Sequence, residues 1–266
     1  DEGHLLVSCA GGVTAEAHLP VKWEQTDGEQ IRLTVTGLMG GHSGVEIDKG
    51  RANACRLLGR TLFTLKDSCH FRLLRLDGGL KDNAIPREAT ALLLCEDGDG
   101  ERVIRELEKV YQNEYRQTDP SIRLVWESTG TKMGQRAMTQ HSTDDVIAAL
   151  VNLPGGIQRM SFDIPGLVQT SLNLGILKAD VEVLRAEYSV RSSVESEKDN
   201  LIAKLSALVE LTGGDYVVTG DYPGWKYRVH SPLREKMVKL YAEMYGTEPK
   251  VEAIHAGLEC GLLGSK

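Results

Sequence analysis

Residues 37–47 read Gly37-Leu38-Met39-Gly40-Gly41-His42-Ser43-Gly44-Val45-Glu46-Ile47. Upstream, apolar and polar residues alternate between positions 30 and 36, which is the period of a half-buried strand. Downstream, an apolar residue recurs at helical spacing from Cys55 to Leu65. The stretch is therefore predicted to be a loop that leads from a strand into a helix.

The composition of this loop points to a binding function. Its four glycines allow positive φ angles or a close approach to another group. Among them stands His42, whose imidazole can donate or accept a proton near neutral pH. A tight turn whose histidine caps the next helix would use the same residues. Residue types alone leave both interpretations open.

The composition of the chain is that of an ordinary globular protein. It has 266 residues, 41% hydrophobic and 26% charged, enough to bury a sizeable core. The net charge of −7 and the lack of a basic run argue against a nucleic-acid partner. No apolar run approaches the ~20 residues that span a bilayer, so no membrane partner is expected. Five cysteines without paired spacing, and a start without signal-peptide features, predict a cytoplasmic protein.

The first half of the chain has strand and helix patterns in the order β-α-β-β-α-β, the split βαβ unit. A short strand from His4 to Cys9, ended by Gly11-Gly12, precedes it. The expected strands lie near 30–36, 71–76, 89–95 and 122–126, and the helices near 48–66 and 103–111.

The second half repeats most of this order. Capping boxes at 142–145 and 196–199 each predict the start of a helix. Strands are expected near 168–177, 181–190 and 216–219. The two halves share no residue-level identity, so the predicted repeat is architectural.

The C-terminal part is predicted to add a helix and a strand. Ser231 and Pro232 begin the helix, Gly246 ends it, and an apolar face is expected to be buried: Leu233, Met237, Leu240 and Met244. The strand at 251–254 runs into His255-Ala256-Gly257-Leu258-Glu259-Cys260-Gly261. His255 and Glu259 could meet as a ligand pair or a hydrogen-bonded dyad. A solvated strand end with a surface salt bridge is the alternative.

These segments together resemble the aminoacyl-histidine dipeptidases (peptidase D, the Xaa-His dipeptidases). That family is one of the di-zinc metallopeptidases, which also include carnosinases and aminoacylases. The matching segments span nearly the whole chain in the family's order: Ser8-Cys9-Ala10-Gly11-Gly12, Gly40-Gly41-His42-Ser43-Gly44-Val45-Glu46-Ile47, Asn83-Ala84-Ile85-Pro86-Arg87-Glu88-Ala89, Gln169-Thr170-Ser171-Leu172-Asn173-Leu174-Gly175, Tyr188-Ser189-Val190-Arg191-Ser192, Tyr222-Pro223-Gly224-Trp225 and His255-Ala256-Gly257-Leu258-Glu259-Cys260-Gly261.

The resemblance implies an α+β fold. Residues 17–222 are expected to form a lid domain of two split β-α-β-β-α-β (ferredoxin-like) halves, about 17–128 and 129–222, with an antiparallel sheet and helices on one face. Residues 1–16 and 223–266 are expected to be short α/β remnants of a catalytic domain. In relatives with a double-length lid the two halves mimic a dimer of single lids, and a homodimer of this chain is a further possibility.

The resemblance also implies roles for individual residues. His42 matches the lid histidine that stabilises the oxyanion when a zinc-bound water attacks the peptide carbonyl. Arg191 matches the residue that holds the C-terminal carboxylate of the dipeptide. Asn83 matches an amide that helps to hold the substrate. Ser171 and Asn173 share one strand face and are candidate donors in the cleft; His255 and Glu259 are expected to line its floor.

No segment of the chain matches the family's metal ligands. The resemblance implies two zinc ions in an intact parent enzyme, but no metal ligand and no bound cofactor in these 266 residues. We therefore expect the lid portion of an Xaa-His dipeptidase that is inactive alone. A non-catalytic binding or dimerisation module with the lid fold is one alternative. A related di-zinc amidohydrolase such as an aminoacylase is the other.

Overall fold

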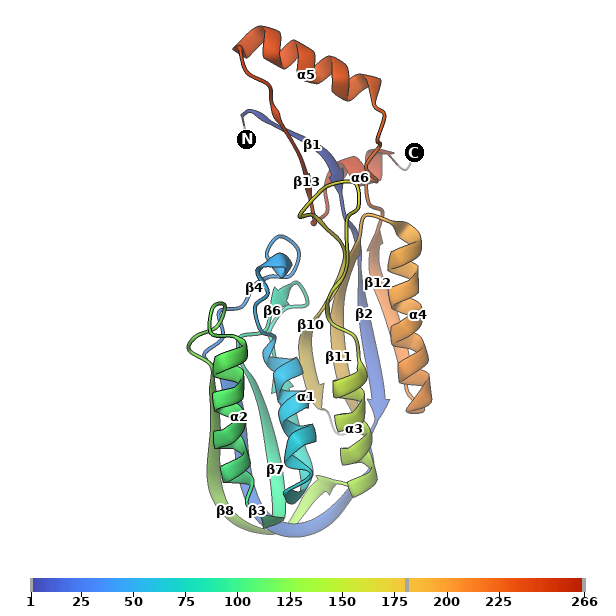
Figure 1. Cartoon of the computed structure of the whole chain (residues 1–266). Coiled ribbons are helices and arrows are strands. Elements are labelled where there is room, and N and C mark those ends of the chain that lie inside the picture. The colour runs from blue at the N-terminus through green and yellow to red at the C-terminus, as the bar shows by residue number, and fades with distance from the viewer. Residues whose placement is uncertain (1, 180–181, 265–266) are drawn as a thin grey trace.

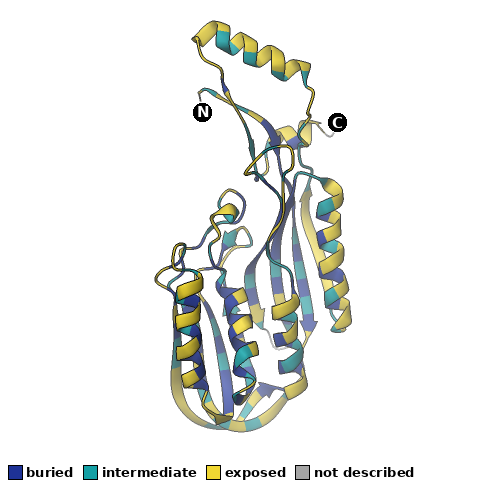
Figure 2. Cartoon of the chain, viewed as in Figure 1, coloured by how far each residue is buried: buried dark blue, intermediate teal, exposed yellow. Residues whose placement is uncertain are grey.

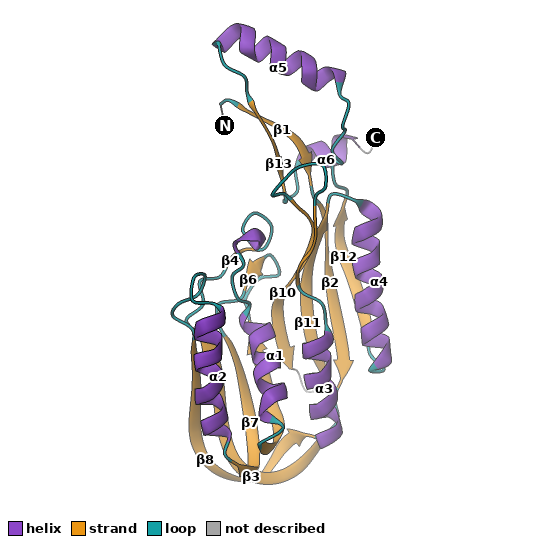
Figure 3. Cartoon of the chain, viewed as in Figure 1, coloured by secondary structure: helices purple, strands orange, loops and turns teal. Residues whose placement is uncertain are grey.

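The computed structural model describes residues 2–179 and 182–264 (Figure 1). Its centre is a nine-stranded sheet whose described pairings are all antiparallel. Helices α1 to α4 pack side by side on one face of this sheet (Figure 3). A flank of two strands and two helices stands at one end. The predicted α+β class and the placement of the helices are confirmed.

The first ferredoxin-like unit, residues 23–138, confirms the predicted order β-α-β-β-α-β. Its elements are β3 (Trp23–Thr36), α1 (Ala54–Leu65), β5 (Cys69–Gly78), β7 (Ala89–Gly98), α2 (Gly100–Glu114) and β8 (Arg123–Met138). The sheet order is β5-β7-β3-β8. The alternating residues of β3 behave as expected, since Ile31, Leu33 and Val35 are buried beneath the helices.

The second unit has the same topology but takes its first strand from the N-terminal part of the chain. Its elements are β2 (Gly11–Pro20), α3 (Gln140–Asn152), β10 (Val168–Ala179), β11 (Val183–Ser192), α4 (Glu195–Leu211) and β12 (Asp215–Tyr222). The sheet order is β12-β2-β11-β10. The first unit is thus inserted between β2 and α3 of the second.

Strand β2 corrects the expected end of the first strand at Gly11-Gly12. The chain instead continues there as a ten-residue strand between β11 and β12. The expected boundary between residues 16 and 17 falls within β2. The second unit therefore consists of β2 together with the segment from α3 to β12, and not of a single segment that starts at residue 129. Residue 181, the predicted start of one strand, lies outside the described residues.

Two units of the same topology meet along one short seam. Within the described residues, β10 and β5 are joined by two pairs of residues, Leu177 with Gly78 and Lys178 with Asp77. Farther along the same edge, β10 pairs with β9 (Gly156–Met160) instead. The strands of the two units therefore part beyond the seam (Figure 1). The turn at Ile47–Lys49, in the loop that carries His42, contacts both β9 and β10.

Three predicted helix starts differ from the structure. Thr139, rather than Ser142, caps α3, because its side chain accepts the Ser142 backbone N–H. Val194 precedes α4 without a side-chain cap. The helix expected from residue 48 is a short 3₁₀ turn, Ile47–Lys49, followed by α1, which begins after its cap Asn53.

The flank consists of β1 (His4–Cys9), α5 (Pro232–Tyr245), β13 (Lys250–Ile254) and α6 (Glu259–Gly264), with β1 and β13 parallel. Ser231 caps α5 and Gly246 ends it, as predicted. The expected burial of its apolar face is wrong: no residue of α5 is buried, because the helix stands away from the sheet (Figure 2).

Candidate functional site

The loop at residues 37–53 is shaped by its glycines and by internal ion pairs. Gly41 has φ +147°, and a Cβ there would lie 2.4 Å from the Arg51 guanidinium. Arg51 pairs with Glu46 at 3.0 Å, and Glu46 accepts the backbone N–H of His42 at 2.8 Å. Glycine is therefore required at position 41 so that Arg51 and Glu46 can close around the backbone of His42.

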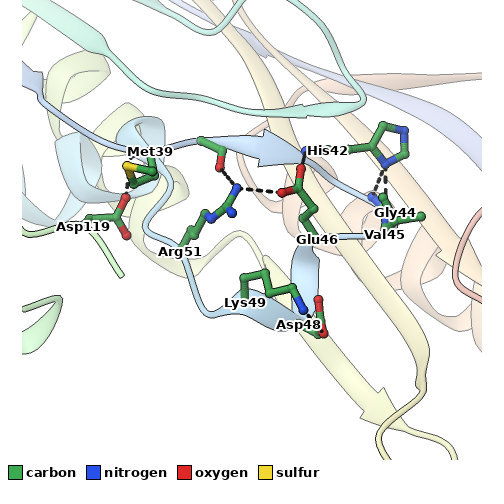
Figure 4. Close-up of polar contacts among 10 residues, drawn as sticks. Met39, His42, Gly44, Val45, Glu46, Asp48, Lys49, Arg51 and Asp119 are labelled. Atoms are coloured by element: carbon green, nitrogen blue, oxygen red, sulfur yellow. Dashed lines mark hydrogen bonds and ion pairs between the residues drawn. The ribbon is translucent and has the colours of Figure 1, made fainter. Parts of the chain in front are cut away.

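Both ends of this loop are tied to the rest of the first unit. The carboxylate of Asp119, which is fully buried, accepts the N–H of Met39 and the N–H of Ala52, each at 2.8 Å. Residues 41–42 form β4 (Gly41–His42), which pairs with β6 (Ala84–Ile85). Figure 4 shows the resulting frame, with Asp119 at one end and the His42 ring at the other. The imidazole thus rests on a fixed backbone.

The hydrogen bonds of His42 fix its tautomer. Nδ1 accepts the backbone N–H groups of Gly44 and Val45, at 3.0 and 3.3 Å. A neutral ring with Nδ1 as acceptor carries its proton on Nε2. Burial, together with the nearby charge of Arg191, lowers the pKa of His42. At neutral pH the side chain is a neutral donor whose Nε2 points away from the loop (Figure 4).

Arg191 lies on β11 in the other unit and is only 7% exposed. Its Nη1 donates to the Tyr222 hydroxyl at 3.0 Å, while its Nε has no hydrogen-bond partner. Among the described residues no carboxylate forms an ion pair with it. A buried cation without an anion is costly. Within the described residues this guanidinium is thus left without an anion that neutralises its charge.

His255 follows β13 and is buried close to Arg191. Burial, with the charge of Arg191, lowers the pKa of His255 to about 3. Its Nε2 lies 2.7 Å from Ser171 Oγ, and the backbone of Val168 also forms a hydrogen bond with the ring. The dyad with Glu259 expected as one alternative is not formed: Glu259 is exposed at the start of α6.

Gly44 connects the two histidines. A Cβ on Gly44 would lie 2.6 Å from the carbonyl oxygen of His255 and 3.0 Å from Cε1 of His42. Beside it, the Oγ of Ser43 is buried without a hydrogen-bond partner, as is Arg191 Nε. Native proteins leave few buried polar atoms unpaired. Two such atoms, supplied by two separate segments of the chain, are consistent with a site that binds a polar ligand.

The remaining predicted residues have distinct surroundings. Asn83 is exposed, and its carbonyl accepts the N–H of Ser43 at 2.9 Å, so it borders the His42 loop. Asn173 is buried and its amide is engaged: it donates to the carbonyls of Asp82 and Ala84 and accepts from Asn53. Asn173 therefore anchors the segment that carries Asn83, whereas Ser171 holds His255.

Two surface hollows border this region. One, with a volume of about 400 Å³, lies between Gly44, the loop at 164–168 and β13, with His255 in its wall. The other contains Gly41 and His42 and is lined by Asn83 and its neighbours. Arg191 borders neither hollow. It is linked to His255 through Ser171, which pairs with Arg191 across the sheet and whose Oγ lies 2.7 Å from His255 Nε2.

Sequence reasoning missed Tyr222, Asp119 and Ser43. Tyr222 belongs to one of the matching segments, but nothing in the sequence indicates that its hydroxyl reaches Arg191. Asp119 precedes a proline and suggests only a turn. Ser43 is adjacent to His42, and that proximity is the one available signal.

The part of the chain that the structure describes contains no cluster of three or more His, Cys, Asp or Glu side chains able to hold a metal ion. Of the described helices, none has both the length and the apolar character needed to cross a lipid bilayer.

Replacing Gly44 by alanine should destabilise the protein by about 1–3 kcal/mol, because the new methyl group overlaps the His255 carbonyl and the His42 ring. Urea denaturation measures the free energy of unfolding. Gly264→Ala, where a Cβ would meet nothing within 4 Å, serves as the control. Equal stability of Gly44→Ala and wild type would contradict the close packing at this point.

The pKa of His255 predicts how stability depends on pH. Below about pH 6.5 the unfolded chain binds a proton at this residue, whereas the folded chain stays neutral down to about pH 3. Stability should therefore fall as pH drops through this window, by about 2 kcal/mol between pH 7 and pH 5 from His255 alone. Urea denaturation at both pH values should show a correspondingly smaller loss for His255→Gln. The exposed control His141→Gln should keep the wild-type loss, and an equal loss in His255→Gln would refute the prediction.

Comparison with known proteins identifies similar sequences and structures. Residues 33–119 match the peptidase dimerisation domain of the M20 family. The chain is 34% identical to the cytosol non-specific dipeptidase of Escherichia coli (strain K12) over 268 residues, 98% of this chain and 55% of that protein. It superposes on the crystal structure of aminoacylhistidine dipeptidase from Vibrio alginolyticus with a TM-score of 0.91 and 31% identity, covering 100% of this chain and 55% of that one. The chain thus spans about half the length of each of these relatives.

Proposed function

Because this chain carries an M20 peptidase dimerisation domain and resembles M20 dipeptidases along its length, we propose that it is the substrate-gripping lid portion of a dipeptidase that hydrolyses Xaa-His dipeptides. The dipeptidase that contains this lid portion is its parent enzyme. On this proposal, residues of the two ferredoxin-like units act on one substrate molecule.

One observation carries the proposal: Arg191 is buried, positively charged and without a carboxylate partner among the described residues, and it pairs across the sheet with Ser171, whose hydroxyl contacts His255. Its charge also lowers the pKa of His42 and of His255. A free dipeptide ends in a carboxylate. A guanidinium can bind such a group through two parallel hydrogen bonds. The unpartnered Nε supplies one suitable donor.

His42 takes the second role in the proposal. Hydrolysis of a peptide bond develops negative charge on the carbonyl oxygen, and a preorganised neutral donor stabilises that charge. The Nε2–H of His42 is such a donor, because both of its Nδ1 contacts hold the ring on a rigid loop. Asn83, at the edge of the same hollow, is proposed to contact the substrate directly.

The other candidate residues are proposed to act in support. Ser171 holds His255, and Asn173 holds the segment that carries Asn83. His255, in the wall of the adjacent hollow, is proposed to line the floor of the substrate cleft. Glu259 is exposed, and for it we propose only a place at the rim of the site.

From the resemblance to the di-zinc metallopeptidases we propose two zinc ions in the parent enzyme, which would supply the attacking water. The described residues do not fit such a centre, since they form no cluster of three possible ligands. The chain by itself is expected to bind substrate without hydrolysing it.

A panel of substrates tests this function in the parent enzyme. Dipeptides with a free C-terminal histidine should be hydrolysed. Their C-terminal amides should require much higher concentrations because they lack the anion that Arg191 binds. An N-acyl amino acid tests the aminoacylase alternative, and preferential turnover of it would reject the dipeptidase. Absence of turnover for every member would favour a non-catalytic binding module.

Assembly and compartment complete the proposal. The matched domain is described as a dimerisation domain, which supports a homodimer of the parent enzyme. Within this chain, however, β5 already pairs with β10 of the second unit. Sedimentation velocity would distinguish a dimer from a monomer in which the pairing of the two units within one chain takes the place of pairing between two chains.

We propose the cytosol as the compartment, supported by five free cysteines and by the name of the Escherichia coli relative.

A further inference from the structure

We propose that Tyr222 is a positioning residue for the substrate carboxylate: its hydroxyl fixes the orientation of the Arg191 guanidinium. This inference rests on the proposed function, because it assigns the anion at Arg191 to the C-terminus of a dipeptide. It adds to that function a residue that touches Arg191.

The register of the sheet brings these residues together. Gly12 on β2 pairs with Arg191 on one side and with Tyr222 on the other, and Arg191 pairs in turn with Ser171. One row across four strands therefore reads Tyr222, Gly12, Arg191, Ser171. Since adjacent members of such a row point to the same face of the sheet, a side chain on Gly12 would separate Tyr222 from Arg191.

Gly12 leaves a gap that the tyrosine ring fills. A Cβ at position 12 would lie 2.4 Å from the Tyr222 hydroxyl oxygen and 2.6 Å from Cζ of the ring. A Cβ on Gly257 would lie 2.7 Å from Cε2 of the same ring. Two glycines from separate segments thus form the surfaces against which Tyr222 packs. The ring has little freedom, and its hydroxyl is held in place.

The contact with Tyr222 is the one side-chain hydrogen bond of Arg191 within the described residues. An arginine side chain has several rotatable bonds, and two-point binding of a carboxylate requires the plane of its guanidinium to be fixed. The hydroxyl accepts from Nη1 at 3.0 Å and leaves Nε unpaired. The Tyr222 hydroxyl can therefore orient the guanidinium and leave its positive charge in place. A carboxylate in the same position would neutralise that charge.

Tyr222 also lies where the chain leaves the sheet for the flank. Three residues later, Trp225 exchanges two backbone hydrogen bonds with Cys9, at 2.9 and 3.0 Å. Between these points, Gly11 and Gly224 approach so closely that a Cβ on Gly11 would lie 2.5 Å from the nitrogen of Gly224. The backbone around Tyr222 is thus fixed from both sides, which suits a residue that must hold another in position.

Tyr222→Phe in the parent enzyme tests the inference, because it removes the hydroxyl and keeps the ring. We expect KM for a free Xaa-His dipeptide to rise about 10-fold, as for loss of a hydrogen bond to a charged group, with kcat changed less than about twofold. KM for the C-terminal amide should not change. Tyr216→Phe, on the same strand, is the matched control and should behave as wild type in both assays.

Arg191→Ala, measured with the same two substrates, separates the positioning role of Tyr222 from the proposed function. If Arg191→Ala raises KM for the free dipeptide and Tyr222→Phe does not, the positioning role is refuted and the proposed function stands. Equal rises for the free dipeptide and the amide in Tyr222→Phe would also refute it, as a general structural defect. If Arg191→Ala itself leaves KM for the free dipeptide unchanged, the proposed function fails.

Discussion

Replacing His42 by alanine in the parent enzyme should lower kcat for an Xaa-His dipeptide by about 10²–10³-fold, with a modest change in KM. The expectation follows from the Nε2–H of His42, which the structure presents as a neutral donor on a rigid loop. A donor that acts on charge developed only in the transition state affects kcat more than substrate binding, and loss of one such donor has this magnitude. Steady-state kinetics at saturating substrate would measure it.

A second histidine provides the control for this experiment. His141 is exposed at the start of α3, where it pairs with Asp145. His141→Ala should keep wild-type kcat and KM. The melting temperature of His42→Ala should remain close to that of wild type, because the ring is only partly buried. Near-normal turnover by a folded His42→Ala enzyme would exclude this imidazole from the reaction.

Arg191→Ala should have the other large effect, about a 10²-fold rise in KM for free dipeptides. A two-point contact between a guanidinium and a carboxylate is worth more than a single neutral hydrogen bond, and here it would form in a buried place. Dipeptide amides lack the carboxylate, so their KM should be unaffected. Comparing the two KM values for each enzyme isolates the contact with the C-terminus.

The same substitution should also change the neighbouring imidazoles. Because the charge of Arg191 lowers the pKa of His42 and of His255, its removal should raise both, which NMR titration would detect. Arg185→Ala serves as the matched control: Arg185 lies on the same strand but is exposed and pairs with Glu16. An equal loss of affinity for free and amidated dipeptides would contradict the assignment of Arg191.

Periodicity is a good guide to the first unit and to every element of the second unit except its first strand, β2. The alternation in β3 and the helical spacing in α1 predict those elements because each buries one face locally. In β2, Val13, Ala15, Ala17 and Leu19 alternate just as clearly and are buried. The pair Gly11-Gly12 suggests the end of a strand, whereas these glycines make room for Gly224 and Tyr222. A close approach between distant segments leaves no local signal.

The candidate site is only partly predictable for the same reason. Resemblance and residue type single out His42 and Arg191, but their proximity depends on the insertion of one unit into the other. The sequence offers Glu259, within the same segment, as the partner of His255, and the partner is Ser171 on β10 instead. The apolar face of α5 has helical periodicity, yet burial requires a second surface, which the described residues do not supply.

The central claim is that His42 and Arg191, from two units of the lid, act on one dipeptide. A crystal structure of the parent enzyme with a phosphinate analogue of an Xaa-His dipeptide tests it most directly, since the phosphinate imitates the charged tetrahedral intermediate. We predict His42 Nε2 within hydrogen-bond distance of a phosphinate oxygen, and the Arg191 guanidinium on the C-terminal carboxylate of the same molecule. An analogue bound with either side chain on an unrelated surface would contradict the claim.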